Sequence, residues 1–108
     1  MLSEKDYERG KYLVYAEEVR KLTEKTFRKE FIENSELRGY DWQLDHKVSV
    51  RDCYINEIPP GIAAHVCNLQ MVPRGYNQHK GSRSSITASE LIEEATSFDS
   101  FWYADEWD

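Results

Sequence analysis

The sequence predicts an α+β domain in which helices at both ends flank a short pair of strands. Three observations predict this class: apolar residues recur at helical spacing near the N-terminus, they alternate in residues 40–50, and a helix-capping pattern begins at Thr87. At 108 residues, with 40% hydrophobic and 31% charged side chains, the chain has the length and composition of one globular domain. The expected single domain (1–108) divides into a helical N-terminal scaffold (1–39), a core (40–87) and a C-terminal helix with an acidic, aromatic tail (88–108).

The N-terminal scaffold is expected to contain two helical segments. Ser3, followed three residues later by Asp6, is a suitable helix start. One apolar helical face then follows, formed by Tyr12, Tyr15, Val19 and Leu22. Thr23 is a candidate cap for a second segment, whose apolar residues are Phe27, Phe31 and Ile32. The sequence at positions 33–35 ends the helical pattern.

Two strands are predicted in the core, separated by a long connection. The first strand lies within residues 40–50, where Trp42, Leu44, Val48 and Val50 alternate with polar residues. The second comprises residues 68–73 and ends at Pro73. Residues 51–67 are predicted to lack regular structure, because Pro59, Pro60 and Gly61 interrupt both a helix and a strand ladder.

Two further helices are expected after the second strand. Residues 74–80 fit a short helix that stops at Gly81. Thr87 and Glu90 form a capping box ahead of a last helix of about ten residues. The expected order is therefore helix, helix, strand, long connection, strand, short helix and final helix.

The net charge of −6 is distributed unevenly. Residues 1–44 are nearly neutral, residues 45–87 carry five Lys or Arg against three acids, and residues 88–108 carry seven acids without Lys or Arg. A basic core beside an acidic end permits a phosphate-binding site that the total charge alone would disfavour. No apolar run has the length of a membrane span, and the N-terminus lacks the apolar core of a signal peptide, so no membrane partner is expected.

The two cysteines, Cys53 and Cys67, do not form a C-x-x-C pair. A disulfide framework and a structural zinc site are therefore not expected. The simplest interpretation is that both are reduced, partly buried thiols in a cytosolic protein.

Four polar residues lie at the predicted strands and the short helix: Asp45, His46, Asn68 and Asn77. A hairpin followed by a helix would bring them around one pocket. Carboxylate and amide oxygens are ligands suited to Mg²⁺ or Mn²⁺. His46 follows Asp45 directly, and an imidazole with an ordinary pKa near ~6.5 can accept a proton from water. This combination is the minimal apparatus for metal-assisted hydrolysis of a phosphodiester.

The same residues lie in segments that resemble the HNH endonuclease family. These segments are Leu44-Asp45-His46-Lys47-Val48-Ser49, Ile58-Pro59-Pro60, Cys67-Asn68-Leu69-Gln70-Met71 and Asn77-Gln78-His79-Lys80-Gly81-Ser82. The resemblance covers residues 40–87 and is to the small HNH and homing-type endonucleases of tailed phages. It implies a ββα-metal (His-Me) finger core flanked by N-terminal and C-terminal helices. It also implies that the protein acts in the cytoplasm of a phage-infected bacterial host.

The resemblance implies a role for each residue of the site. His46 would be the general base, and Asn68 would brace the loop and orient that histidine. Asp45 and Asn77 would bind a single Mg²⁺ or Mn²⁺ ion. His79 is a rival metal ligand, but two residues along a helix it points about 200° away from Asn77. The side chains expected to contact DNA, double-stranded by expectation, are Lys80, Arg74, Lys47 and Arg83.

Other interpretations stay open. Asp45 and His46 could be a hydrogen-bonded pair at a strand end, Asn77 could be only a helix N-cap, and His65, beside apolar residues, is interpreted as structural. Residues 98–108 hold five of the fourteen aromatic residues and four acids. They could pack on the N-terminal helices, dock another protein or cover the basic pocket. The alternative function is therefore a non-catalytic phage interaction protein on an HNH scaffold, which binds a protein partner through this tail.

Overall fold

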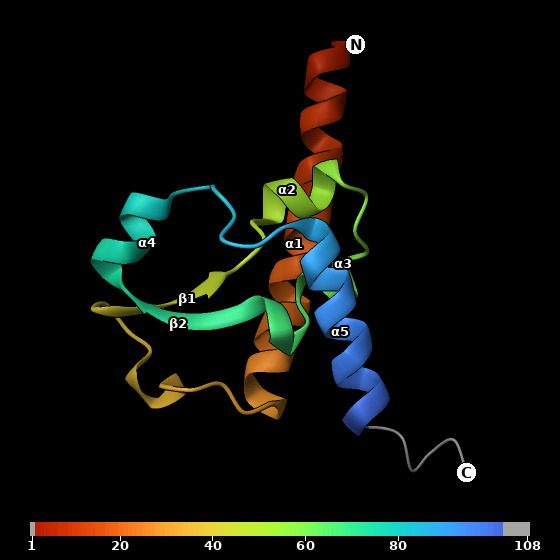
Figure 1. Ribbon diagram of the computed structural model, residues 1–108. Coiled ribbons are helices and arrows are strands. Elements are labelled where there is room, and N and C mark those ends of the chain that lie inside the picture. The colour runs from red at the N-terminus through yellow and green to blue at the C-terminus, as the bar shows by residue number, and fades with distance from the viewer. Residues whose placement is uncertain (1, 103–108) are drawn as a thin grey trace.

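A computed structural model describes residues 2–102 of the chain (Figure 1). In chain order, the elements of this part are α1 (Glu4–Lys29), the 3₁₀ turn η1 (Ser35–Leu37), β1 (Trp42–His46), α2 (Val50–Ile55), α3 (Pro60–Ala63), the 3₁₀ turn η2 (Val66–Asn68), β2 (Leu69–Pro73), α4 (Arg74–Lys80) and α5 (Ala88–Trp102). The two strands and α4 lie together on one side of the molecule, and the other helices gather beside them. Helices combined with a small antiparallel sheet confirm the predicted α+β class.

Helix α1 begins where the sequence predicts and continues further than expected. The hydroxyl of Ser3 caps it by accepting a hydrogen bond from the amide of Asp6 at 3.1 Å. The helix continues without a break through Thr23 to Lys29, so the prediction of a second segment capped at Thr23 is wrong. Thr23 is buried, and its hydroxyl bonds to a residue of β1 instead of to the helix backbone. Phe31 and Ile32 lie beyond the end of the helix.

Strands β1 and β2 pair antiparallel, with His46 opposite Leu69 and Asp45 opposite Gln70. Because side chains alternate between the faces of a strand, the two faces of this hairpin differ. One face packs in an apolar cluster with the end of α1 and the residues that follow it. This cluster consists of Ile32, Leu69, Met71, Phe27, Trp42, Leu44 and Val66. The other face carries Gln43 and Asp45 and is covered by α4, which hydrogen-bonds to both.

The connection between the strands is more regular than the sequence suggests. It contains α2, α3 and η2, so the prediction that residues 51–67 lack helix is wrong. Ser49 caps α2 by accepting from the amide of Asp52 at 3.0 Å. Pro60 occupies the start of α3, where a missing N–H costs no hydrogen bond. The prolines therefore delimit a short helix and do not prevent one.

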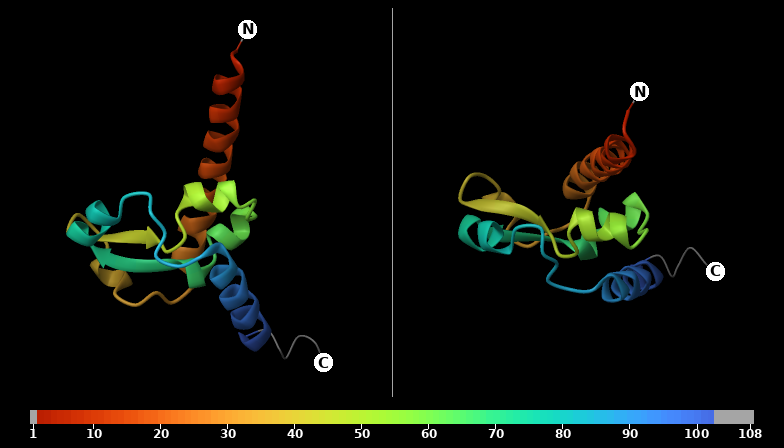
Figure 2. Two further views of the ribbon diagram at one scale, coloured as in Figure 1. Left: turned by 45° about the horizontal axis from the view of Figure 1, so that its top comes forward. Right: turned by 90° about the horizontal axis from the view of Figure 1, so that it is seen from above.

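A second apolar core joins this connection to the outer helices. Its buried residues are Val19, Val48, Cys53, Ile58, Ala63, Ala64 and Leu91. The Tyr15 hydroxyl donates to the carbonyl of Ile58 at 2.6 Å and so links α1 to the segment before α3. Figure 2 shows α1 and α5 on opposite sides of α2 and α3. The connection is thus held on both sides, and this fixes the ends of the two strands.

Helix α5 begins at the predicted capping box but is longer than the expected ten residues. The amide of Glu90 donates to the Thr87 hydroxyl at 3.1 Å, and the amide of Thr87 donates to the Glu90 carboxylate at 3.2 Å. Of the tail aromatics, Phe98 packs against His65, whereas Phe101 and Trp102 are 76% and 63% exposed and are not packed on α1. The rest of the tail interpretation concerns residues 103–108, which lie outside the described residues. Within residues 2–102, no helix has the length and apolar character that a membrane span requires.

Candidate metal and base site

Asp45 is a buried carboxylate whose two oxygens are both paired. The ammonium of Lys80 donates to Oδ1 at 3.0 Å, and the side-chain amide of Gln70 donates to Oδ2 at 3.0 Å. Lys80 also donates to the carbonyl of His46 at 2.8 Å. A charge removed from water needs such partners, because its desolvation is otherwise uncompensated. Lys80, expected from the sequence to contact phosphate, is therefore buried and serves as the internal partner of Asp45.

Asn77 lies on the same side of α4 as Lys80, three residues earlier, and both face the hairpin. Its Nδ2 donates to Oε1 of Gln43 at 2.8 Å, which leaves its amide oxygen for another partner. Residue 77 lies inside α4, whose N-cap is Pro73, so the interpretation of Asn77 as an N-cap is wrong. His79 is exposed and does not share this position. The interface between hairpin and α4 therefore pairs Asp45 with Lys80 and Gln43 with Asn77. His46 instead contacts α1, so the residues expected around one pocket are divided between two faces of the hairpin.

His46 ends β1 and points to the opposite face of the strand from Asp45. Its Nε2 is hydrogen-bonded to the hydroxyl of Thr23 at 2.9 Å. Burial lowers the pKa of His46 below its ordinary value; the charge of Asp45 opposes this shift and that of Lys80 reinforces it. Within residues 2–102 no hydrogen bond joins the side chains of Asp45 and His46, so they are not the strand-end pair considered above. A neutral imidazole at pH 7 is the protonation state that a general base requires.

Asn68 is fully buried and braces the chain that follows His46. Its Oδ1 accepts from the amide of Val48 at 2.7 Å, and its Nδ2 donates to the carbonyls of Val48 at 3.1 Å and Ala63 at 2.8 Å. Its own carbonyl accepts from the amide of Lys47 at 2.7 Å. These bonds fix the exit of β1 against α3, and thereby the place of His46.

The other basic residues expected to contact DNA, Arg74, Lys47 and Arg83, lie on or beside the hairpin and α4. They differ in their exposure and in their contacts. Arg74 lies over the ring of Tyr40, 4.4 Å from its centroid, and Lys47 is half-buried. Arg83 is exposed, and its guanidinium donates to the carbonyls of Lys80 and His79. Apart from Lys80, the basic residues proposed from the sequence thus keep some exposure to solvent.

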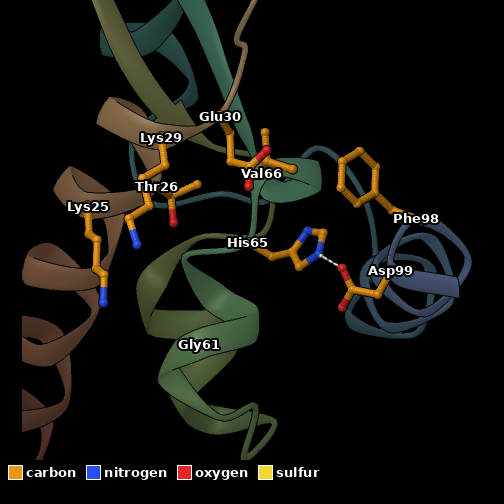
Figure 3. Close-up of a pocket in the computed structure, with 9 residues that line it drawn as sticks. All are labelled: Lys25, Thr26, Lys29, Glu30, Gly61, His65, Val66, Phe98 and Asp99. Carbon is orange, nitrogen blue, oxygen red and sulfur yellow. Dashed lines mark hydrogen bonds and ion pairs between the residues drawn. The ribbon is translucent and has the colours of Figure 1, made fainter. Parts of the chain in front are cut away.

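A second histidine, His65, lies beside a pocket of about 200 Å³ between α1, α3 and α5 (Figure 3). Its Nδ1 accepts a hydrogen bond from the backbone amide of Cys67 at 3.0 Å, so the ring proton is on Nε2. Nε2 donates to Oδ1 of Asp99 at 2.8 Å. The ring of Phe98 packs edge-on against it. Because both ring nitrogens are engaged, His65 acts as a structural residue that attaches α5 to η2.

Thr23, Gln43 and Gln70 contact the site and were not identified from the sequence. The glutamines have no distinctive local signal, because polar residues are ordinary on an alternating strand. Thr23 does have one: it follows Val19 by four residues and therefore lies on the apolar face of the helix. A polar side chain on a buried face needs a hydrogen-bond partner, which here is His46.

In comparisons with known proteins, no family model, curated protein or solved structure matches the chain.

The residues present fit a single divalent ion under one condition. Within the described part of the chain, no three His, Cys, Asp or Glu side chains are grouped to hold a metal. A site would depend on the Asp45 carboxylate and the Asn77 amide oxygen, with water and substrate completing the shell. The Lys80 ammonium, 3.0 Å from Asp45 Oδ1, shows that this position accepts a positive charge. The condition is that a divalent ion there competes with the Lys80 ammonium for that oxygen.

Proposed function

We propose that the protein is a divalent-metal-dependent HNH endonuclease that hydrolyses or nicks DNA phosphodiester bonds. One observation carries this proposal: in a strand, strand and helix unit, Asp45 and Asn77 lie at the interface of hairpin and helix, and His46 ends the first strand. The same order of elements supports the ββα-metal finger that the sequence resemblance implies. The cytoplasm of a phage-infected bacterium remains the location expected from that resemblance.

In the proposed reaction, His46 takes a proton from a water molecule as the water oxygen attacks phosphorus. The new phosphorus–oxygen bond forms while the bond to the leaving sugar oxygen breaks, and solvent water returns a proton to that oxygen. Asp45 and Asn77 would hold the divalent ion, which when bound supplies neutralisation of phosphate charge and stabilisation of the leaving oxygen. Asn68 keeps the histidine in place through the backbone at Val48.

Substrate binding would depend on a few cations. Arg74, Lys47 and Arg83 surround the hairpin and α4, and each phosphate contact adds to the salt dependence of binding. A small number of contacts predicts weak binding that is lost as salt is raised. This is why activity should be sought at low ionic strength.

Nicking of supercoiled plasmid at low salt, with Mg²⁺, Mn²⁺ or EDTA, tests the proposal. We expect metal-dependent nicking that falls about 10²–10⁴-fold in His46→Ala, the range for loss of a general base. His65→Ala is the matched control, because that imidazole has both nitrogens engaged and should not be needed for cleavage. Absence of cleavage by folded, metal-supplied wild-type protein would contradict the proposal.

A non-catalytic interaction protein is the second candidate function. The observation that favours it is the exposure of Phe101 and Trp102 at the end of α5, next to an acidic sequence. Thermal unfolding with Mn²⁺ separates the two functions. A metal at 100 times its dissociation constant stabilises a protein by about 2.7 kcal/mol, and Asp45→Asn should abolish that gain. No stabilisation and no cleavage would favour the interaction protein.

A further inference from the structure

Helix α1 contributes a side chain to the candidate site, although it lies outside the hairpin and α4. Thr23 is 4% exposed and lies one helical turn after Val19, which is fully buried. Its Oγ1 is 2.9 Å from Nε2 of His46. The contact joins two residues far apart in sequence, so it depends on how α1 packs across the end of β1.

The hydrogen bond at Nε2 determines what the other ring nitrogen can do. A neutral imidazole has one nitrogen that donates and one that accepts. If Nε2 holds the proton, Nδ1 has a free lone pair; if Nδ1 holds the proton, the lone pair is at Nε2, where Thr23 occupies it. Only the first arrangement leaves a nitrogen able to accept a proton from water.

The surroundings of Nδ1 are consistent with that arrangement. Within residues 2–102, Nδ1 of His46 has no hydrogen-bond partner. Within the same residues, the only fully buried side-chain nitrogen or oxygen without a hydrogen-bond partner is Nε of Arg74. Nδ1 is therefore not fully buried, whereas Nε2 faces α1.

We propose that Thr23 is the positioning residue for His46: its hydroxyl accepts a hydrogen bond from Nε2–H and thereby keeps Nδ1 unprotonated and facing water. In the cleavage step, Nδ1 takes the proton of the attacking water, and the imidazolium that forms keeps its Nε2–H bond to Thr23. This inference rests on the proposed function for its effect on cleavage. The tautomer itself is a property of the metal-free protein and is measured separately.

The test compares wild type with Thr23→Val, which keeps the shape but loses the hydroxyl, and with Thr23→Ser, which keeps the hydroxyl. Long-range ¹⁵N–¹H NMR of the metal-free chain reports which ring nitrogen carries the proton, and His65 is an internal reference whose Nε2–H form the hydrogen bonds already define. We expect His46 in the Nε2–H form in wild type and Thr23→Ser, and a mixture of forms in Thr23→Val. Plasmid nicking should show kcat lower by about 10–100-fold in Thr23→Val, as for other groups that orient a reacting side chain, and near wild type in Thr23→Ser.

Several outcomes would overturn the proposal. An Nδ1–H form in wild-type protein does so without any variant, even if Thr23→Val fails to fold. Equal activity of wild type and Thr23→Val, or equal losses in the valine and serine variants, does so from the kinetics. Failure of the proposed function is distinct, because it appears as absence of cleavage in wild type while the NMR comparison still reports the tautomer.

Discussion

Within residues 2–102, the imidazole rings of His46 and His65 both form hydrogen bonds, but they differ in what the second ring nitrogen does. His46 bonds to a neutral hydroxyl through Nε2, lies beside the Asp45–Lys80 ion pair and has an Nδ1 that is not fully buried. His65 uses both nitrogens, one for a backbone amide and one for a carboxylate, and Phe98 packs on its ring. The difference in this protein lies in the second ring nitrogen: that of His65 is hydrogen-bonded, whereas that of His46 is left as a candidate base.

The largest expected difference between the surroundings of the two histidines is the stability lost when the ion pair beside each one is broken. The side chains of Lys80 and Asp45 are 7% and 5% exposed, whereas those of His65 and Asp99 are 14% and 55% exposed. Lys80→Met leaves a buried carboxylate without its cation and should cost about 3–5 kcal/mol in the free energy of unfolding. Asp99→Asn disrupts a half-exposed pair and should cost less than about 1 kcal/mol. Urea unfolding measures both.

The double variant Lys80→Met with Asp45→Asn is the control for this prediction. It removes the unpaired charge and should recover part of the loss, which gives the coupling between the two residues. Mn²⁺ should stabilise Lys80→Met more than wild type, because no ammonium then competes for Asp45. Equal losses from Lys80→Met and Asp99→Asn would show that the two surroundings do not differ as described.

Asn68 connects the two surroundings through its side chain and its backbone. Its side chain bonds to Val48 and Ala63, and its backbone N–H, which an alanine would keep, donates to the carbonyl of His65 at 2.8 Å. Asn68→Ala removes three buried side-chain hydrogen bonds and should cost about 3 kcal/mol, at roughly 1 kcal/mol each. Asn77→Ala, which removes one half-buried bond, should cost about 1 kcal/mol or less. Comparable losses in urea unfolding would contradict this account of Asn68 as the brace.

The pH dependence of stability should be due partly to His46. Since the pKa of His46 is lowered on folding, the unfolded chain binds a proton before the folded chain does as pH falls. The free energy of unfolding should therefore decrease as pH falls below about 6.5. His46→Gln should reduce that slope, with His65→Gln as the matched control for loss of a histidine. Parallel stability curves for wild type and His46→Gln between about pH 7 and pH 5 would oppose this prediction.

The smallest effect concerns the two thiols, Cys53 in the apolar core and Cys67 near His65. Cys53 lies fully buried in the core after β1, and burial raises the pKa of its thiol to about 11. Cys67 follows His65 and is only half-buried, although burial raises its pKa as well. A thiol reagent at about pH 8 should therefore modify Cys67 first, with Cys53 reacting only on unfolding. Mass spectrometry of the modified sites over time measures the order, and equal rates would mean that the core around Cys53 opens readily.

The sequence predicted the elements that have strong local signals. Alternation within residues 40–50 predicted the first strand, although β1 ends at His46, before Val48 and Val50. The run that ends at Pro73 predicted the second strand, Pro73 and Gly81 delimited α4, and the capping box located the start of α5. Local rules failed where a segment combines helix and breaker signals. Pro59 and Pro60 indicated an irregular connection, whereas Ser49 and the fixed backbone of Pro60 suit the starts of two short helices.

The site was harder to predict because its contacts join distant parts of the chain. Lys80, one helical turn after Asn77, was expected to contact phosphate. It is buried because α4 packs on the hairpin and places its ammonium on Asp45, 35 residues earlier. Thr23 was interpreted as a helix cap because its actual partner, His46, is 23 residues away in sequence and becomes adjacent only in the folded chain. Neither contact follows from local propensity.

The long connection between β1 and β2 also has a consequence for how the protein folds. A hairpin closed by a tight turn can form within one local segment, but here α2, α3 and η2 separate the paired strands. Pairing must wait for loop closure, and non-local contacts of this kind slow folding. During synthesis, β1 leaves the ribosome without a partner until Pro73 has followed it. Asp45 therefore acquires its partners Gln70 and Lys80 only after they have been synthesised, whereas Thr23, the partner of His46, precedes it in the chain.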